Sequence, residues 1–289
     1  MLPLLLPLLA ESLNDSRNSA TSRSTFFEPF LGGGALFFAL NEQQLSVEKY
    51  SLNDLNADLI NCYTIVRNRV DDLIEILSSM ERDCSEKRYY LVRQSDPQTS
   101  LTRAARTIYL NRLCFNGLYR LNRGGQFNVP YGHLKKPKVC NETVLREASR
   151  SLQRATLSTS DFAQAVSKSR SGDIIYFDPP YSPLSSTSNF SSYHNSSFGI
   201  DEHERLSATI SELTSRKVRV ILSNSDTRFT RACFKHLNLY SIPARRSISA
   251  SSSGRISVTE LLGTNFAFDH KNSPIPIKKV SLKNTKDLD

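Results

Sequence analysis

The chain has 289 residues, of which 39% are hydrophobic and 22% are charged, and this composition excludes collagen, a coiled coil and a fully disordered chain. Lysine and arginine total 37 against 28 aspartate and glutamate, so the formal net charge is +9 and a polyanionic partner is favoured. The five cysteines form no CxxC pair, and none stands at metal-ligand spacing from a histidine. Neither a disulfide framework nor a structural metal site is therefore expected, and a reducing compartment is the simpler interpretation.

The first ten residues, from Met1 to Ala10, are almost entirely apolar. They contain two prolines and no basic residue, and they are too few to span a bilayer, so we predict an apolar first helix packed on its domain. The following segment, 11–24, is rich in serine, asparagine and arginine and predicts a loop. No other segment is apolar over the roughly 20 residues that a membrane-spanning helix needs.

A strand, a glycine turn, a helix and a second strand are predicted next. The strand covers Thr25–Leu31, the triplet Gly32–Gly34 breaks it, a helix begins at Ala35, and Val47–Leu52 is the second strand, ending at Asn53-Asp54. This order is typical of an α/β nucleotide-binding fold, in which glycines let a cofactor approach the backbone and an acid such as Asp54 accepts from ribose hydroxyls. The triplet alone is equally consistent with a tight turn, and the spacing does not distinguish a dinucleotide from another adenosine cofactor.

The pattern of alternating strands and helices stops after residue 57 and returns near residue 155. Between these points the apolar spacing predicts helix within Ala57–Leu77 and Leu101–Leu113, and Gly117–Gly132 has loop composition. Strands are predicted again at Ala155–Leu157, Asp173–Phe177 and Lys217–Leu222, loops at Ser182–Gly199 and Ser247–Ser253, and a frayed tail beyond Phe268. We therefore predict a catalytic domain of residues 1–57 and 151–268, a mostly helical insert of 58–150, and a flexible tail of 269–289.

The most specific motif is Asp178-Pro-Pro-Tyr181, which directly follows the predicted strand. An exocyclic amine on an aromatic base is a poor nucleophile, and two acceptors held on its N–H groups would aim its lone pair at an electrophile. Asp178 supplies a carboxylate and Pro179 a backbone carbonyl, while Pro179 and Pro180 make the turn rigid and carry no competing N–H. Tyr181 offers a ring on which an extruded base can stack. The plain alternative is a rigid turn after a strand, with Asp178 only capping it.

At these residues the sequence resembles the Dam-type DNA adenine-N6 methyltransferases, from about Phe26 to Asn265. The matching segments, in the order typical of the α group of these enzymes, are Glu28-Pro-Phe-Leu-Gly-Gly-Gly34, Tyr109–Arg120, Gly125–Gly132, Asp178-Pro-Pro-Tyr181, Ser223-Asn-Ser-Asp-Thr227 and Arg245-Arg-Ser-Ile248.

The resemblance implies a Rossmann-like S-adenosylmethionine-dependent methyltransferase fold, S-adenosylmethionine as methyl donor, no metal, and an adenine flipped out of duplex DNA as acceptor, within a GATC-like target. It further implies a cytoplasmic, nucleoid-associated bacterial enzyme. The cofactor-binding residues that it implies are Phe30, Gly32 and Gly34 along the cofactor, Asp54 at its ribose, Asp161 and Phe162 at its adenine, and Asp178 beside its methyl group.

The resemblance also places DNA recognition in the insert. Phe115 would wedge into the base stack, Arg120 would contact a guanine through two hydrogen bonds, and Pro130 is the third base-recognition position. Phosphate contacts or turn positions are implied for Asn116, Asn122, Asn128 and His133, and the segment Ser223–Asp226 would support the catalytic pocket. Without the resemblance, the usual interpretations would be a core aromatic ring, a solvated arginine and polar turns.

Family members begin with a Trp-Ala-Gly-Gly-Lys-like segment, and this chain, which has no tryptophan, starts where that segment ends. Either the gene start was placed too late, or the protein is naturally truncated, and for the second case another hypothesis is a DNA-binding protein that has lost its activity. A third hypothesis keeps the enzyme class but has N4 of cytosine as the methyl acceptor, because similar turns also occur in enzymes that methylate cytosine N4. The match in the recognition region favours adenine. Roles in restriction-modification, mismatch repair and replication control all stay open, as do the oligomeric state and a cognate nuclease.

The positive charge is concentrated in the predicted insert. Between Ser85 and Arg150 there are 13 lysine and arginine residues against 4 aspartate and glutamate, a surplus of nine, and the rest of the chain is formally neutral. The whole imbalance thus lies in the segment expected to contact DNA phosphates, and charge reversals at Arg103, Arg112 or Lys135 are expected to weaken a salt-sensitive interaction.

Overall fold

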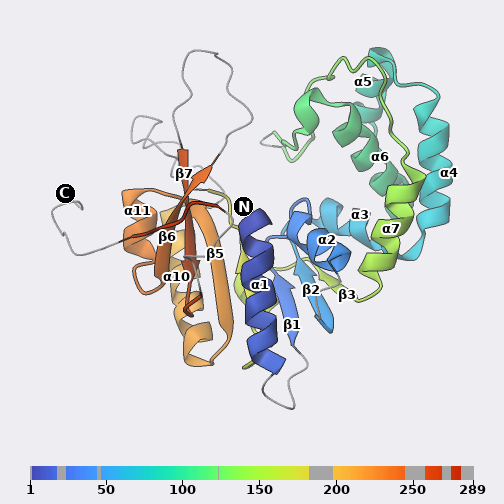
Figure 1. The fold of residues 1–289 in the computed structure, drawn as a ribbon. Coiled ribbons are helices and arrows are strands. Elements are labelled where there is room, and N and C mark those ends of the chain that lie inside the picture. Colours follow the sequence, from blue (N-terminus) through green and yellow to red (C-terminus); the bar gives the residue numbers. More distant parts are fainter. Residues whose placement is uncertain are drawn as a thin grey trace. The chain divides into compact units, whose positions relative to one another are not determined.

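A computed structural model describes residues 2–17, 24–43, 47–122, 124–181, 198–244, 258–268 and 275–280. The chain divides into two compact units, a first of Met1–Asn53 with Ser160–Asp289 and a second of Asp54–Thr159 (Figure 1). The sequence predicted changes of domain after residues 57 and 150. The assignment of catalysis to one unit and DNA recognition to the other remains a prediction.

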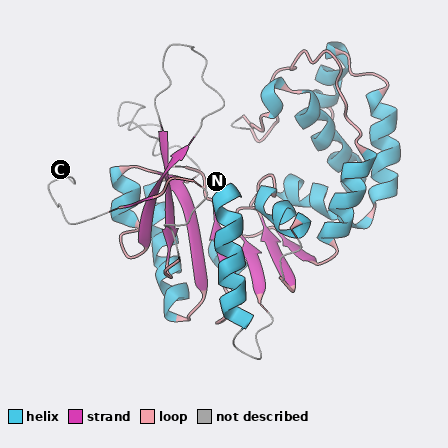
Figure 2. Cartoon of the chain, in the orientation of Figure 1, coloured by secondary structure: helices cyan, strands magenta, loops and turns pink. Residues whose placement is uncertain are grey.

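The first unit combines helices with a mixed sheet (Figure 2). Its helices are α1 (Leu2–Arg17), α2 (Ala35–Glu42), α8 (Phe162–Val166), α10 (Ile200–Ser215) and α11 (Arg228–Cys233). Its strands are β1 (Thr25–Glu28), β2 (Lys49–Asn53), β4 (Ile174–Phe177), β5 (Arg219–Ser225), β6 (Asn238–Ala244), β7 (Val258–Thr264) and β8 (Lys278–Lys279).

The strands of the first unit lie in the order β2-β1-β4-β5-β7-β6-β8. Strands β2, β1, β4 and β5 are parallel, with Glu28 opposite Leu52 and Phe177 opposite Leu222, whereas β7 runs antiparallel to β5 and β6. The carboxyl ends of the parallel strands therefore meet at one edge, which is where α/β sheets bind their ligands. The predicted α/β fold class is confirmed.

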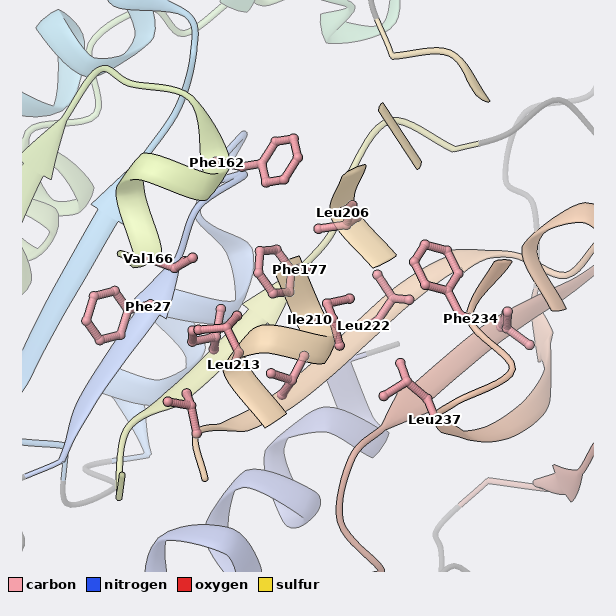
Figure 3. Packing of buried hydrophobic residues seen from close by; sticks show 14 of the residues in the cluster. Phe27, Phe162, Val166, Phe177, Leu206, Ile210, Leu213, Leu222, Phe234 and Leu237 are labelled. Atoms are coloured by element: carbon pink, nitrogen blue, oxygen red, sulfur yellow. The ribbon is translucent and has the colours of Figure 1, made fainter. Parts of the chain in front are cut away.

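An apolar core packs helix α10 against the sheet (Figure 3). The strands contribute Phe27, Phe177 and Leu222, and α10 contributes Leu206 and Ile210. Strand β4 is buried at all four positions, as expected for a parallel strand covered on both faces. This burial holds the end of β4, and with it the Asp-Pro-Pro-Tyr turn, against a rigid support.

Helix α1 confirms the predicted apolar first helix, since Leu4, Leu5, Leu8 and Leu9 are buried. The loop predicted for 11–24 is wrong at its start, because α1 continues to Arg17. Extending an established helix costs little per residue, and the Arg219 side chain donates to the backbone carbonyl of Ser12. Within the described part of the chain, no helix has both the length and the apolar character needed to cross a membrane.

The second unit is mostly helical. It comprises α3 (Ala57–Asn68), α4 (Val70–Glu81), α5 (Glu86–Gln94), α6 (Ser100–Leu113), the 3₁₀ turn η1 (Phe115–Gly117), α7 (Glu142–Leu152) and the short strand β3 (Ala155–Ser158). The helical segment predicted from Ala57 to Leu77 is two helices, because Arg69 leaves helical geometry (φ −142°) and its guanidinium pairs with Asp72 in the next turn. Helices α5 and α7 were missed because few of their residues are buried, and their signals are the capping side chains of Ser85 and Asn141.

Other boundaries also differ from the sequence prediction. The strand predicted over Thr25–Leu31 ends at Glu28, because Pro29 has no N–H to donate to a neighbouring strand. The tail predicted to be frayed contains β8, in which Lys279 lies opposite Tyr240 of β6. The loops predicted at Ser182–Gly199 and Ser247–Ser253 fall almost entirely outside the described residues.

Candidate functional site

The Asp-Pro-Pro-Tyr turn follows β4 directly, at the carboxyl edge of the parallel strands. Its ends, Asp178 and Tyr181, are exposed, whereas Pro179 is buried. The Ser223 hydroxyl of β5 donates to Asp178 Oδ1 across 3.3 Å. Ser223, in the segment predicted to support the catalytic pocket, thus contacts the turn, and its supporting role stays a prediction. Asp226, at the end of the same motif, instead accepts from Arg231 and Ser241.

The Asp178 carboxylate is solvent-accessible, yet the protein groups around it alter its titration. Desolvation by these groups raises its pKa, and the negative charge of Glu260 acts in the same direction. Hydrogen bonds from Ser223, Tyr181 and Tyr176 oppose the rise. The site therefore holds an acceptor that is poorly solvated but remains open to a ligand.

The glycine turn after β1 has the left-handed backbone that its composition suggested. Gly32 (φ 48°) and Gly34 (φ 65°) both lie in that region, and Gly34 caps α2. A Cβ added at Gly32 would meet no atom within 4 Å, so the turn borders open space. Phe30 lies beside it, with its ring centroid 5.4 Å from that of Phe162 and 6.3 Å from that of Phe177.

Glu28, the last residue of β1, is a functional candidate that no sequence pattern singles out. Its side chain is 3% exposed, and its Oε2 atom makes no hydrogen bond within the described part of the chain. Burial, reinforced by the nearby charge of Asp178, raises its pKa well above the usual range. A buried carboxyl with an unused oxygen at the ligand edge of the sheet is suited to a cationic group.

Asp161 and Phe162 begin helix α8 and are held by an arginine that the sequence analysis missed. The Asp161 carboxylate accepts from the backbone N–H of Ala163 at 2.9 Å and from Arg205 through both of its oxygens, at 2.8 and 2.6 Å. The guanidinium of Arg205 also lies 4.2 Å from the centre of the Phe162 ring. The hydrogen bonds from Arg205 hold the pKa of Asp161 below its usual range.

The predicted ribose ligand, Asp54, directly follows β2 and is the first residue of the second unit. Its backbone N–H donates to the Ser158 carbonyl at 3.3 Å, and its Oδ1 accepts from the Asn56 N–H at 2.9 Å. The carboxylate is thus fixed by the start of α3.

In the second unit, the predicted wedge Phe115 is half-exposed, at 50%. Its backbone N–H donates to the carbonyl of Pro130 at 2.9 Å, so two of the three predicted base-recognition positions are in direct contact. Asn116 has a left-handed backbone (φ 54°) and serves as a turn residue at this point. Two isolated bridges, Cys114 to Tyr131 and Leu121 to Phe127, make an irregular hairpin of the segment predicted to be a loop.

The hairpin also fixes Arg120. The side chain of Asn128 accepts from Arg120 Nε at 2.7 Å, its carbonyl accepts from Nη2 at 3.3 Å, and its own N–H donates to the Arg120 carbonyl. Asn122 forms the turn, with Oδ1 accepting from the N–H groups of Gly124 and Gln126. His133 has a left-handed backbone (φ 50°), and its ring meets Tyr131 edge-on. Asn122 and Asn128 therefore shape the hairpin, and their contact with DNA stays a prediction.

A hollow of about 530 Å³ lies between this hairpin and helices α5 and α6 of the second unit, lined by Arg93, Arg103, Arg106, Tyr119, Phe127 and Asn128 among others. No group of three or more histidine, cysteine, aspartate or glutamate residues arranged for a metal ion occurs in the described ranges.

Comparison with known proteins decides the family. The model of the D12 class of N6 adenine-specific DNA methyltransferases matches residues 4–248. The chain belongs to this family. It is 41% identical over 249 residues to type II methyltransferase M1.LlaDCHI of Lactococcus lactis, covering 83% of this chain and 86% of that protein. It is 37% identical to type II methyltransferase M.MjaIII of Methanocaldococcus jannaschii (83% and 88% covered) and 34% identical to the DNA adenine methylase of Escherichia coli K12 (86% and 89% covered).

The family confirms the predicted resemblance and the enzyme class: the protein is an adenine-specific DNA methyltransferase, whose substrate is DNA and whose reaction needs a methyl donor. The cytosine hypothesis is excluded at the level of family. The sheet has parallel strands and an antiparallel β7, and helices pack on it. This arrangement agrees with the Rossmann-like methyltransferase fold expected from the sequence.

Proposed function

We propose that this methyltransferase transfers a methyl group from S-adenosylmethionine to N6 of an adenine in a GATC-like site of duplex DNA. The observation that carries the proposal is the Asp178 turn: an accessible carboxylate, tied to Ser223, at the ligand edge of a parallel sheet. The GATC-like target follows from the resemblance of the hairpin, which carries Phe115, Arg120 and Pro130, to Dam-type enzymes.

The residues of the first unit suit S-adenosylmethionine. When bound, this cofactor supplies a methyl group made electrophilic by a sulfonium cation. The buried Oε2 of Glu28 would gain a cationic partner, and the open space over Gly32 admits a ligand against the backbone. Asp161, Phe162 and Phe30 would hold its adenine end. The role of Asp54 at the ribose stays the expectation drawn from the sequence.

The turn would act on the adenine amine through two acceptors. The Asp178 carboxylate takes one N–H, and the Pro179 carbonyl takes the other, which draws the nitrogen toward a tetrahedral geometry. The ring of Pro179 removes a competing N–H and fixes its φ angle, and Pro180 behind it restricts the ψ angle that sets the direction of the Pro179 carbonyl. Tyr181, with 39% of its surface exposed, presents a ring face to a base that has left the stack. The enzyme contributes positioning and polarisation, so no nucleophilic side chain is required.

The proposal is tested by transfer of labelled methyl from S-adenosylmethionine to duplexes that differ only in GATC. We expect N6-methyladenine to form in the GATC duplex and little product in a duplex in which GATC is scrambled. Equal methylation of both duplexes would overturn the target assignment. Binding of the GATC duplex without any methyl transfer would instead favour the hypothesis of an inactive DNA-binding protein.

Arg205 is expected to organise the adenine end of the cofactor site. Replacing it with alanine removes two hydrogen bonds to Asp161 and the cation above Phe162. Because Arg205 and Asp161 are about two-fifths exposed, water screens the pair, and we expect a loss of affinity of only about 3- to 10-fold. Calorimetric titration with S-adenosylhomocysteine measures the loss. The control is Arg216→Ala, which removes an arginine that donates to the Ser167 carbonyl directly after α8. An equal loss of affinity for S-adenosylhomocysteine in both variants would exclude Arg205 from the cofactor site.

Charge reversal in the second unit is expected to weaken DNA binding in a salt-dependent way. The exposed side chains of Arg103 and Lys135 suit reversal, whereas Arg112 donates to the Lys138 carbonyl and is left intact. For every DNA phosphate that the protein no longer neutralises, the slope of log K against log salt becomes shallower by about 0.9. The matched control is the double reversal of Lys278 and Lys279 on β8, which removes the same charge and is expected to do less. Equal slopes of log K against log salt for the two double variants would contradict the prediction that the positive charge of the second unit contacts DNA phosphates.

A further inference from the structure

A chain of three hydroxyl and carboxyl groups links the interior of the sheet to the Asp-Pro-Pro-Tyr turn. The phenol oxygen of Tyr176 lies 2.5 Å from Ser223 Oγ, and Ser223 Oγ lies 3.3 Å from Asp178 Oδ1. Tyr176 and Ser223 are almost fully buried, at 4% and 0% exposure, whereas Asp178 is exposed. The chain therefore runs from the core to the accessible carboxylate.

The direction of the hydrogen bonds follows from the number of protons. A serine hydroxyl has one proton, and an ionised carboxylate has none to give. Ser223 donates its proton to Asp178, so Tyr176 must donate its proton to Ser223. The Tyr176 hydroxyl thereby fixes which way the Ser223 hydroxyl points and excludes the alternative in which Ser223 donates inward.

The register of the sheet places these groups together. Tyr176 lies opposite Ile221 and Phe177 opposite Leu222 in parallel strands, so the next pair at the strand ends is Asp178 and Ser223. The side chains of Tyr176 and Asp178 are two residues apart and emerge on the same face of β4. Ser223, on the neighbouring strand, is within reach of both. This arrangement is built on two buried strands and not on a loop.

We propose that Tyr176 and Ser223 are positioning residues that hold the Asp178 carboxylate in one orientation for the adenine amine, with Tyr176 acting mainly through Ser223. The inference rests on the proposed function of the turn. Without Tyr176 and Ser223 the exposed Asp178 side chain would be held by Tyr181 alone. Each unproductive orientation would then reduce the fraction of enzyme able to polarise the amine.

Removing the hydroxyl groups is expected to lower kcat and leave KM little changed. A hydrogen bond to a charged group has an energy that corresponds to a rate loss of about 10-fold or somewhat more for Ser223→Ala, and of about 3- to 10-fold for Tyr176→Phe. The control is Tyr240→Phe, which deletes a buried tyrosine hydroxyl on β6 of the same sheet. Thermal unfolding and binding of S-adenosylhomocysteine confirm that each variant is folded.

The double variant separates positioning from general support of the fold. If Tyr176 acts mainly through Ser223, Tyr176→Phe lowers kcat in the wild-type background and has a clearly smaller effect in the Ser223→Ala background. If the losses of kcat in the two single variants multiply in the double variant, Tyr176 does not act through Ser223 and the proposal is overturned. Unchanged kcat in both single variants, with active wild-type enzyme, would overturn the positioning role. Absence of transfer by the wild-type enzyme would count against the proposed function instead.

The pH dependence supplies a readout that a purely structural role would not change. The groups that face Asp178 are Glu28 on β1, Glu260 on β7, and the hydroxyls of Tyr176, Tyr181 and Ser223. The hydrogen bond from Ser223 lowers the pKa of Asp178, so Ser223→Ala is expected to raise it. Transfer that needs the ionised carboxylate is then lost at a higher pH than in the wild-type enzyme. Carbon-13 NMR titration of the Asp178 carboxyl in the cofactor-free protein checks the shift, and an unchanged pKa would overturn the proposed contact.

Discussion

Replacement of Asp178 by alanine is expected to reduce methyl transfer by about 10³-fold and to leave DNA binding largely intact. Removal of one preorganised polar group that acts in a transition state typically has an effect of this size. Alanine leaves the Pro179 carbonyl as the remaining acceptor for the amine, so the nitrogen lone pair stays delocalised into the ring. Single-turnover transfer of labelled methyl to a GATC duplex measures the rate, and fluorescence anisotropy measures DNA affinity.

The matched control for this variant is Asp201→Ala, which removes an exposed carboxylate from the first turn of α10, outside the turn that follows β4. Both variants make the net charge more positive by one unit, so a general electrostatic effect on DNA binding would appear in both. Turnover within a few-fold of wild type in Asp178→Ala would exclude the amine-polarising role. Equal loss in Asp201→Ala would show that charge, and not position, governs the rate.

The turn was predictable because its signals are local. A run of apolar residues, Ile174–Phe177, predicts a buried strand, and two prolines end it at once. Glycine at positions 32 and 34 likewise predicts the left-handed turn that the structure shows. Each of these inferences depends only on the stereochemistry of a few neighbouring residues.

Local sequence patterns do not predict the partners of these residues, because the partners depend on register and helix packing; the segment that holds Ser223 was expected near the turn only from the family resemblance. Ser223 is 45 residues from Asp178 along the chain, and Arg205 is 44 residues from Asp161. The pairing of β4 with β5 and the docking of α10 bring them together, and neither event leaves a local pattern. The break between α3 and α4 has a different origin: Arg69 leaves helical geometry there, and arginine is a common helix residue that gives no local signal of a break.

The second unit, whose role in DNA recognition is a prediction, shows the same difference between local and non-local signals. An exposed aromatic and an arginine in a glycine-rich segment have no periodic signal, so their assignment rested on family resemblance. The structure adds that the hairpin is ordered by its own side chains, since Asn128 holds Arg120 and Asn122 closes the turn. A preorganised arginine loses less conformational entropy on binding than one that hangs free in solvent.

The duplexes compared are GATC and a sequence in which the guanine of GATC is replaced. Replacement of Arg120 by alanine is expected to reduce discrimination between them by about 10- to 100-fold, which is the effect of one good two-bond contact to a base. The bonds to Asn128 use Nε and one N–H of Nη2, so three of the five guanidinium N–H groups remain to donate to guanine O6 and N7. Transfer rates on the two duplexes, measured at one salt concentration, give the ratio directly.

A second arginine distinguishes base recognition from loss of charge. Arg88, on α5 of the same unit, carries the same charge outside the hairpin, and Arg88→Ala is expected to reduce the affinity for both duplexes by a similar factor, if at all. Asn128→Ala tests the preorganisation, because it removes the 2.7 Å bond and leaves the charge in place; we expect a smaller loss of discrimination in the same direction as Arg120→Ala. If Arg120→Ala weakens binding to the two duplexes equally, as Arg88→Ala does, then Arg120 contacts the DNA backbone and the base specificity lies elsewhere in the insert.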